Sequence, residues 1–175
     1  LLIYIITLAI ATTVAIAQDY ETDFRELQQQ FEERLKTTPA NLKAYMASYP
    51  YSTYTDEIYF MEGVLYAEKG KYKQAIKAFS KVNAKNLSRE SQPMLYFYWG
   101  YTLVKQNNYQ QALSQLLRLK NQNSLYTPHA RYYAGYCYYC MKEFPRALAE
   151  FLAVEQLSGY QQIVPYYIIQ IDYAQ

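Results

Sequence analysis

The sequence predicts an all-α protein, a solenoid in which helix–turn–helix pairs stack along the chain. Three similar stretches follow one another, beginning at Asp56, Pro93 and Pro128. Apolar residues within them follow helical spacing, as at Tyr59 and Tyr66. A glycine and an alanine recur in all three, at intervals of 37 and 35 residues: Gly63, Gly100 and Gly135, and Ala75, Ala112 and Ala147. Such self-similarity at a nearly fixed period is typical of repeat proteins.

The composition is that of a chain that folds. Of the 175 residues, 51% are hydrophobic and 18% are charged, which is enough apolar material for a core. The net charge of +2 is too small to predict a nucleic-acid partner. Tyrosine is in excess, with 23 residues. Its large apolar face and polar hydroxyl suit contact surfaces as well as cores.

Residues 1–17 form an uncharged, mostly apolar run that ends in Ala15-Ile16-Ala17. This pattern is typical of a secretory signal peptide and predicts a mature chain that begins at Gln18. An uncleaved membrane anchor is the alternative, since upstream residues could extend the run to the roughly 20 apolar residues of a span. We expect the chain to be a section of a longer protein, with sequence on both sides.

Residues 18–55 predict a degenerate leading helix pair and a connector, with helices near 22–36 and 40–48. Each repeated stretch then predicts two helices, separated where Gly70 or the pair Asn107-Asn108 breaks the apolar pattern. The second helices are expected over residues 74–82, 111–119 and 146–154, and prolines open the first helices at Pro93, Pro128 and Pro165. A glycine inside a helix costs about 1 kcal/mol relative to alanine, so its recurrence predicts close approach of the paired helices.

These features resemble the tetratricopeptide-repeat (TPR) family, whose unit is a helix–turn–helix of about 34 residues. Three residues depart from the family pattern, namely Glu62, Arg131 and Asp172. The residues that carry the resemblance are Tyr59, Gly63, Tyr66, Ala75, Phe79 and Val82, then Tyr96, Trp99, Gly100, Leu103, Ala112, Leu116 and Leu119, then Ala134, Gly135, Tyr138, Ala147, Phe151 and Val154.

The TPR resemblance implies a right-handed superhelix of antiparallel helix pairs. Its units would span residues 56–92, 93–127 and 128–164, with the start of a truncated fourth unit at 165–175. The connector at residues 49–56 is similar to that of bacterial envelope TPR proteins, including outer-membrane assembly lipoproteins and Tol–Pal partner proteins. Together with the signal peptide, it predicts an exported bacterial protein in the periplasm or associated with the outer membrane.

The family resemblance also implies where a partner would bind. In TPR proteins the first helices line the concave face, and here these positions form a mostly aromatic stripe. We expect this stripe to form the partner-binding groove, through apolar and stacking contacts and hydroxyl hydrogen bonds. The alternative is that other segments bury it. The groove residues are Phe60, Val64, Phe97, Tyr101, Lys105, His129, Tyr132, Tyr136, Tyr139, Tyr166 and Tyr173.

No catalytic residues, metal site or cofactor are predicted. The pair Cys137 and Cys140 forms a CxxC motif inside a predicted helix. We interpret the two as buried or groove-lining thiols, with a disulfide as the alternative. A structural zinc site requires four ligands. The two cysteines supply only two, and His129, the chain's only histidine, lies eight residues upstream of Cys137.

The sequence therefore predicts a non-catalytic protein-interaction scaffold of the bacterial periplasm or outer envelope, which binds a protein or peptide segment on its aromatic groove. Two alternatives stay open. One is a glycan-binding protein of the outer-membrane nutrient-uptake type, and the other is the docking arm of a larger enzyme. Membrane association is expected only through an uncleaved N-terminal segment or through a partner.

Overall fold

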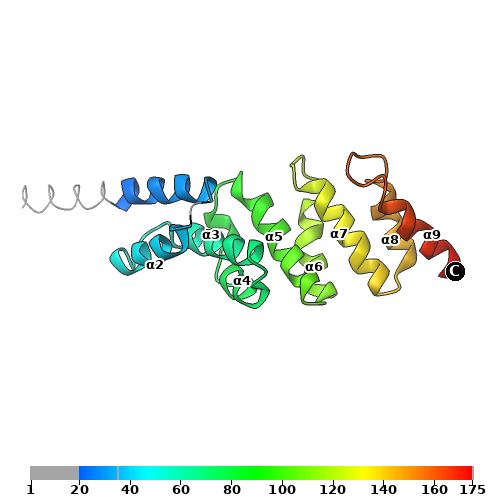
Figure 1. Ribbon diagram of the computed structural model, residues 1–175, viewed down its shortest axis with the longest axis horizontal. Helices are drawn as coiled ribbons and strands as arrows, with labels where there is room; N and C mark the ends of the chain where they lie inside the picture. The colour runs from blue at the N-terminus through cyan, green and yellow to red at the C-terminus, as the bar shows by residue number, and fades with distance from the viewer. Residues whose placement is uncertain (1–19, 35, 175) are drawn as a thin grey trace, which may run out of the picture.

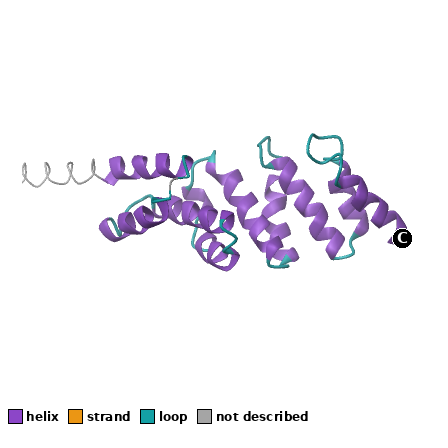
Figure 2. Ribbon diagram, viewed as in Figure 1, coloured by secondary structure: helices purple, strands orange, loops and turns teal. Residues whose placement is uncertain are grey.

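The computed structural model describes residues 20–34 and 36–174, and Figure 2 shows these as helices joined by loops, without strands. The predicted signal peptide lies outside the described residues. A helix over residues 20–32 comes first. The elements that follow are α2 (Thr38–Ser48), α3 (Thr55–Glu68), α4 (Tyr72–Phe79), η1 (Ala84–Asn86), α5 (Ser91–Lys105), α6 (Tyr109–Leu116), η2 (Leu117–Leu119), α7 (Thr127–Cys140), α8 (Phe144–Leu152) and α9 (Val164–Ala174).

The helices stand in one elongated row (Figure 1). Along it, α3 packs with α4, α5 with α6, and α7 with α8, and each pair also contacts the next. The prediction of an all-α helix-pair solenoid is therefore confirmed. No helix in the described part of the chain is both long and apolar enough to cross a membrane.

The turn inside each pair holds one residue in the left-handed backbone region. These residues are Gly70, Asn107 and Lys142, with φ of 70°, 56° and 60°. Glycine adopts this conformation freely and asparagine tolerates it, but for lysine it costs roughly 1–2 kcal/mol. The first two turns were predicted from the sequence. The third carries no such signal in the sequence.

The recurring glycines make room for a side chain of the second helix. A Cβ added at Gly100 would lie 2.5 Å from Leu116 Cγ, and one at Gly135 would lie 2.8 Å from Phe151 Cδ1. At Gly63 the ring of Phe79 occupies the corresponding space. The glycines were thus read correctly as packing residues. The close approach that they permit is of a helix backbone to a large apolar side chain.

The leading helix covers the first pair. Its residues Phe24, Leu27 and Phe31 are buried, and the Phe31 ring lies 6.0 Å from that of Phe60 on α3. At its end, Arg34 donates from Nε to both carboxylate oxygens of Glu68 at 3.1 Å.

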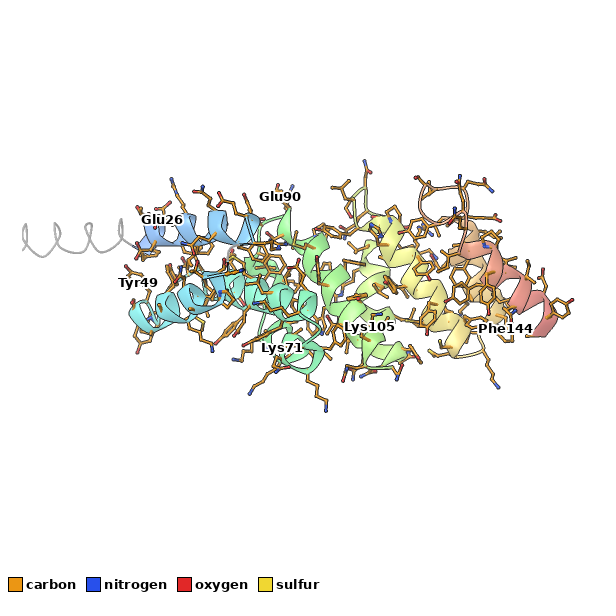
Figure 3. All side chains as sticks on the ribbon, viewed as in Figure 1. Glu26, Tyr49, Lys71, Glu90, Lys105 and Phe144 are labelled. Carbon is orange, nitrogen blue, oxygen red and sulfur yellow. The ribbon has the colours of Figure 1, made fainter. Side chains whose placement is uncertain are left out.

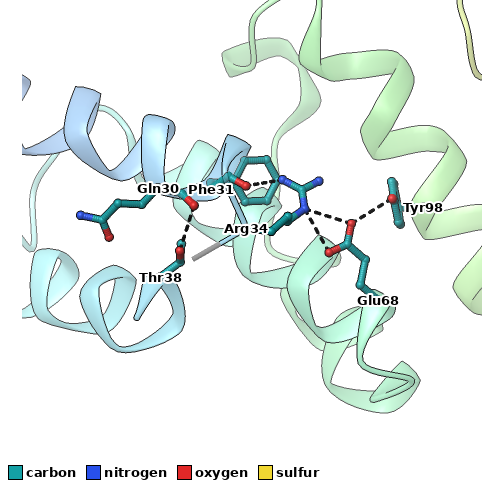
Figure 4. Close-up of polar contacts among 6 residues, drawn as sticks. All are labelled: Gln30, Phe31, Arg34, Thr38, Glu68 and Tyr98. Carbon is teal, nitrogen blue, oxygen red and sulfur yellow. Dashed lines mark hydrogen bonds and ion pairs between the residues drawn. The ribbon is translucent and has the colours of Figure 1, made fainter. Parts of the chain in front are cut away.

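Figure 4 shows how this contact continues into α5. The Tyr98 hydroxyl donates to Glu68 Oε1 at 3.1 Å, and the Arg34 guanidinium donates to the Phe31 carbonyl. Thr38, at the start of α2, donates to the Gln30 carbonyl at 3.1 Å. Three segments are therefore joined through one carboxylate, which holds the leading helix against α3 and α5.

A buried carboxylate joins α7 to α8. Glu150 is 3% exposed, and its oxygens accept from Lys120 Nζ at 2.6 Å and Arg131 Nη1 at 2.9 Å. Arg131 Nη2 also donates to the Lys120 carbonyl at 3.0 Å. This explains why Arg131 departs from the family pattern, because a buried carboxylate requires a charged partner at this position.

Candidate functional site

A hollow of about 340 Å³ opens across three successive first helices. Its lining comes from the C-terminal end of α5, the middle of α7 and the first turn of α9. We call it the tyrosine hollow, because four of its lining residues are tyrosines. The residues that line the hollow are Val104, Lys105, Asn107, Tyr132, Tyr133, Tyr136 and Tyr167.

Helical spacing and edge-on ring contacts position the tyrosines. Tyr132 and Tyr136 stand one turn apart on α7, with Tyr133 beside them. The Tyr167 ring lies 6.2 Å from that of Tyr132 and 5.9 Å from that of Tyr136, in edge-to-face geometry. On its other side Tyr167 stacks on Phe151 at 5.1 Å. These contacts hold the rings in place before any ligand arrives, which reduces the entropy cost of binding.

Three tyrosines of the hollow, Tyr132, Tyr133 and Tyr136, have raised pKa values, so their hydroxyls stay protonated at physiological pH. Burial and hydrogen bonding to Tyr167 raise the pKa of Tyr132, and a hydrogen bond to the Cys140 thiol and burial raise that of Tyr136. Burial, together with Tyr72, raises the pKa of the neighbouring Tyr101 to about 12. A protonated phenol both donates and accepts hydrogen bonds. The hollow therefore offers apolar ring faces with adaptable polar edges.

Lys105 is the one charged residue among those that line the hollow. Its ammonium lies 5.3 Å from the centre of the Tyr101 ring, within the range of a cation–π contact. The side chain is exposed and forms no ion pair within the described residues. It is therefore available to a negative group on a ligand.

Three of the predicted groove residues line the hollow: Lys105, Tyr132 and Tyr136. Others extend the aromatic surface on either side of it. Phe97 stacks on Tyr101 at 6.0 Å, and Tyr101 meets Tyr133 edge-on at 5.2 Å. Phe97 also contacts the His129 ring at 5.7 Å, and Tyr139 meets Tyr167 at 5.3 Å.

The structure places two predicted residues in the core instead. Phe60 is 4% exposed, with the Phe31 ring of the leading helix packed against it, and Val64 is fully buried. These two residues cannot contact a partner in this conformation. The aromatic stripe is therefore buried by other segments at the first pair, which was the alternative prediction. From α5 onward it is partly open.

On α9 the predicted tyrosines lie outside the hollow. Tyr166 and Tyr173 are 60% and 89% exposed, whereas Tyr167, which was not predicted, lines it. The buried residues Val164 and Ile171 show which face of α9 turns inward, and Tyr167 lies one turn from the first of them. Spacing between these apolar residues was the signal in the sequence that could have identified Tyr167.

The remaining candidates are the two cysteines and the histidine of α7. Cys137 and Cys140 are free thiols, and burial, with the neighbouring Cys140, raises the pKa of Cys137 to about 12. A thiol that stays protonated is a poor nucleophile and metal ligand. His129 Nδ1 shares a hydrogen bond of 2.6 Å with the Tyr160 hydroxyl. Within the described residues, no group of three His, Cys, Asp or Glu side chains could hold a metal ion.

The helix pairs, their packing glycines and the aromatic hollow define a tetratricopeptide-repeat type of solenoid. The chain belongs to the Iml2/Tetratricopeptide repeat protein 39 family, whose model matches residues 1–171. The predicted family is thus confirmed. Neither the curated proteins nor the solved structures gave a match. Proteins of this type are generally non-catalytic and bind other proteins on their curved surfaces, so the family indicates an interaction scaffold.

Proposed function

We propose that this chain is a non-catalytic scaffold that binds an extended peptide segment of a partner protein in the tyrosine hollow. The observation that carries the proposal is the hollow itself, which three successive first helices build from fixed tyrosine rings. A segment laid across α5, α7 and α9 contacts all three at once. Such contacts bury apolar area on the rings and satisfy peptide groups through the hydroxyls.

The chemistry of the lining narrows the kind of segment. The residues that line the hollow include one cation, Lys105, and no carboxylate. A carboxylate on the segment would therefore be attracted to Lys105, and no carboxylate of the lining would repel it. Proline suits the rest of the surface, because it presents a flat apolar ring and carries no N–H that would need an acceptor. We expect a proline-rich segment with an acidic residue.

This expectation is tested with a fluorescently labelled proline-rich peptide that contains one aspartate, measured by fluorescence anisotropy. Changing Tyr132 and Tyr136 together to Ala removes two of the ring faces, and should weaken binding at least about tenfold, since each lost stacking contact contributes about 0.5–1.5 kcal/mol beyond the buried area. Changing both to Phe keeps the rings and removes the hydroxyls, so its loss should be smaller. Lys105→Ala should lower the affinity for this peptide by a larger factor than the affinity for a peptide in which Asn replaces the Asp.

The matched control is Tyr51→Ala, since Tyr51 is 97% exposed and lies outside the hollow. It should bind as the unchanged protein does. Equal affinity of the Tyr132/Tyr136 double variant and the control would contradict the proposal. Circular dichroism of each variant shows whether it is folded.

Glycan binding is the second candidate, because tyrosine faces and hydroxyls also suit the stacking and hydrogen bonding of sugar rings. Calorimetric titration with an oligosaccharide set separates the two. Saturable sugar binding that is lost in the double Ala variant, with no peptide binding, would support the glycan function instead.

We also propose that the scaffold works outside the cytoplasm, in the bacterial periplasm or at the outer membrane. The proposal rests on the apolar run at residues 1–17 and its Ala15-Ile16-Ala17 ending. In a bacterial host that expresses the chain with its own N-terminal region, the periplasmic fraction should contain a protein whose first residue is Gln18. Replacing Ala15 and Ala17 with Phe should block this cleavage, because the cleavage site requires small residues. An unprocessed protein in the cytoplasm would contradict the proposal.

A further inference from the structure

Residues 69–89 carry seven basic residues and no acidic one. The whole chain has a net charge of +2, so the rest of it carries a net charge of −5. The seven are Lys69, Lys71, Lys73, Lys77, Lys81, Lys85 and Arg89. Charge is thus strongly concentrated in one segment, which comprises α4, η1 and the loops beside them.

The helix of this segment turns its apolar residues inward and its lysines outward. Ala75, Ala78 and Phe79 are buried on the inner face of α4. Lys73 and Lys77 are four residues apart on α4, which places them along one side of this helix, and Lys81 follows just after the helix ends at Phe79. All seven basic residues are exposed, and we call the surface around the six lysines the lysine face. In Figure 3, Lys71 lies along one edge of the molecule, and Glu26 and Glu90 lie along the opposite edge.

Neighbouring groups neutralise little of this charge. The ion pairs within the described residues involve none of the seven. The nearby Asp56 instead accepts from the Asn83 backbone N–H at 2.6 Å and from Asn86 Nδ2 at 2.7 Å. Lys81 lies 4.3 Å from the centre of the Tyr59 ring. Seven like charges in a short segment repel one another, and an anionic partner would relieve this repulsion.

The kind of side chain on the lysine face indicates the partner. Six of the seven are lysines, which act as flexible point charges and do not read phosphate geometry as arginine does. The segment has no exposed large hydrophobic residue, so it offers neither a stacking platform for bases nor an apolar anchor. Clusters of four to eight lysines or arginines are typical of attraction to anionic lipid headgroups when they lie on an amphipathic helix, as Lys73 and Lys77 do on α4.

We propose that the lysine face docks the solenoid on an anionic lipid surface by electrostatic attraction alone. The lysine face belongs to α4 and its loops, whereas the tyrosine hollow is lined from α5, α7 and α9. The chain can therefore hold a peptide while it lies on a membrane. This association needs neither an N-terminal anchor nor a partner, the two routes that the sequence suggested.

The test is cosedimentation of the protein, without residues 1–17, with vesicles of phosphatidylcholine alone or mixed with phosphatidylserine. We expect binding to the mixed vesicles only, and its loss as salt is raised. Changing Lys73, Lys77 and Lys81 together to Glu should weaken binding at least about tenfold, since each lysine near an anionic surface contributes to the attraction and each glutamate opposes it. The matched control changes Lys36, Arg118 and Lys142 to Glu, the same change in net charge at exposed sites outside the segment.

Equal loss in the two triple variants would overturn the proposal, because net charge would then account for the binding. Failure of the unchanged protein to bind the mixed vesicles would also overturn it. Polyuridylate is the competing probe. If the unchanged protein binds polyuridylate but not the vesicles, and the triple lysine variant binds neither, the surface would be assigned to nucleic acid. The peptide assay on the same variants is independent, since none of these residues lines the tyrosine hollow.

Discussion

Phe79→Ala is expected to lower the free energy of unfolding by about 3–5 kcal/mol. Phe79 is fully buried, and its ring fills the space beside Gly63 on α3. Removing the ring leaves a cavity that the glycine cannot fill.

Gly63→Ala should destabilise as well, by about 1–3 kcal/mol, because the added Cβ would lie 2.9 Å from Phe79 Cζ and closer still to two other ring carbons. This overpacking outweighs the gain of about 1 kcal/mol in helix propensity.

The double variant distinguishes packing from propensity. In the Gly63→Ala, Phe79→Ala protein the new methyl group enters the space that the ring has left. The combined loss, measured by urea unfolding, should therefore be smaller than the sum of the single losses by about 1–2 kcal/mol. Gly63→Ala combined with Phe151→Ala, which lies in another helix pair, should be additive. A neutral or stabilising Gly63→Ala would show that the glycine is not needed for packing.

Arg131→Ala is expected to lower the free energy of unfolding by about 2–3 kcal/mol. The change removes the hydrogen bonds to Glu150 and to the Lys120 carbonyl and leaves a buried carboxylate with one cation. Arg131→Lys keeps the charge but cannot make both contacts, so we expect an intermediate loss. Chemical unfolding in urea measures each effect.

Arg146→Ala is the matched control for this change. Arg146 pairs with Glu143 at 2.8 Å in an exposed geometry, with 68% of its side chain accessible. Exposed pairs of this kind contribute about 0–1 kcal/mol. If the variants at positions 131 and 146 were equally stable, the buried ion cluster would contribute no more to the free energy of unfolding than an exposed ion pair does.

The helix pairs could be predicted from the sequence because their signals are local. Apolar spacing, the turn residues Gly70 and Asn107 and the recurring glycines each report on neighbours within one pair. Lys142 adopts the same turn conformation between α7 and α8 with no such signal. Arg131 stood out only as a departure from the family pattern. Its reason, the carboxylate of Glu150, lies nineteen residues away on the next helix.

The candidate site was predictable only in part. Lys105, Tyr132 and Tyr136, which were predicted from their positions along first helices, line the tyrosine hollow. Their use by a partner stays a prediction. Phe60 and Val64 occupy similar positions but are buried, since what covers a helix face depends on segments far away in the sequence.

The order of residues along this chain thus decides where helices form, how they pair and which side chains face inward, because those properties depend on spacing within about one repeat. Long-range packing decides which part of the aromatic stripe stays open. The leading helix closes the stripe at α3, and α9 brings Tyr167 against α7 to complete the hollow. The burial of a surface is a property of all the elements around it, and no local pattern encodes that.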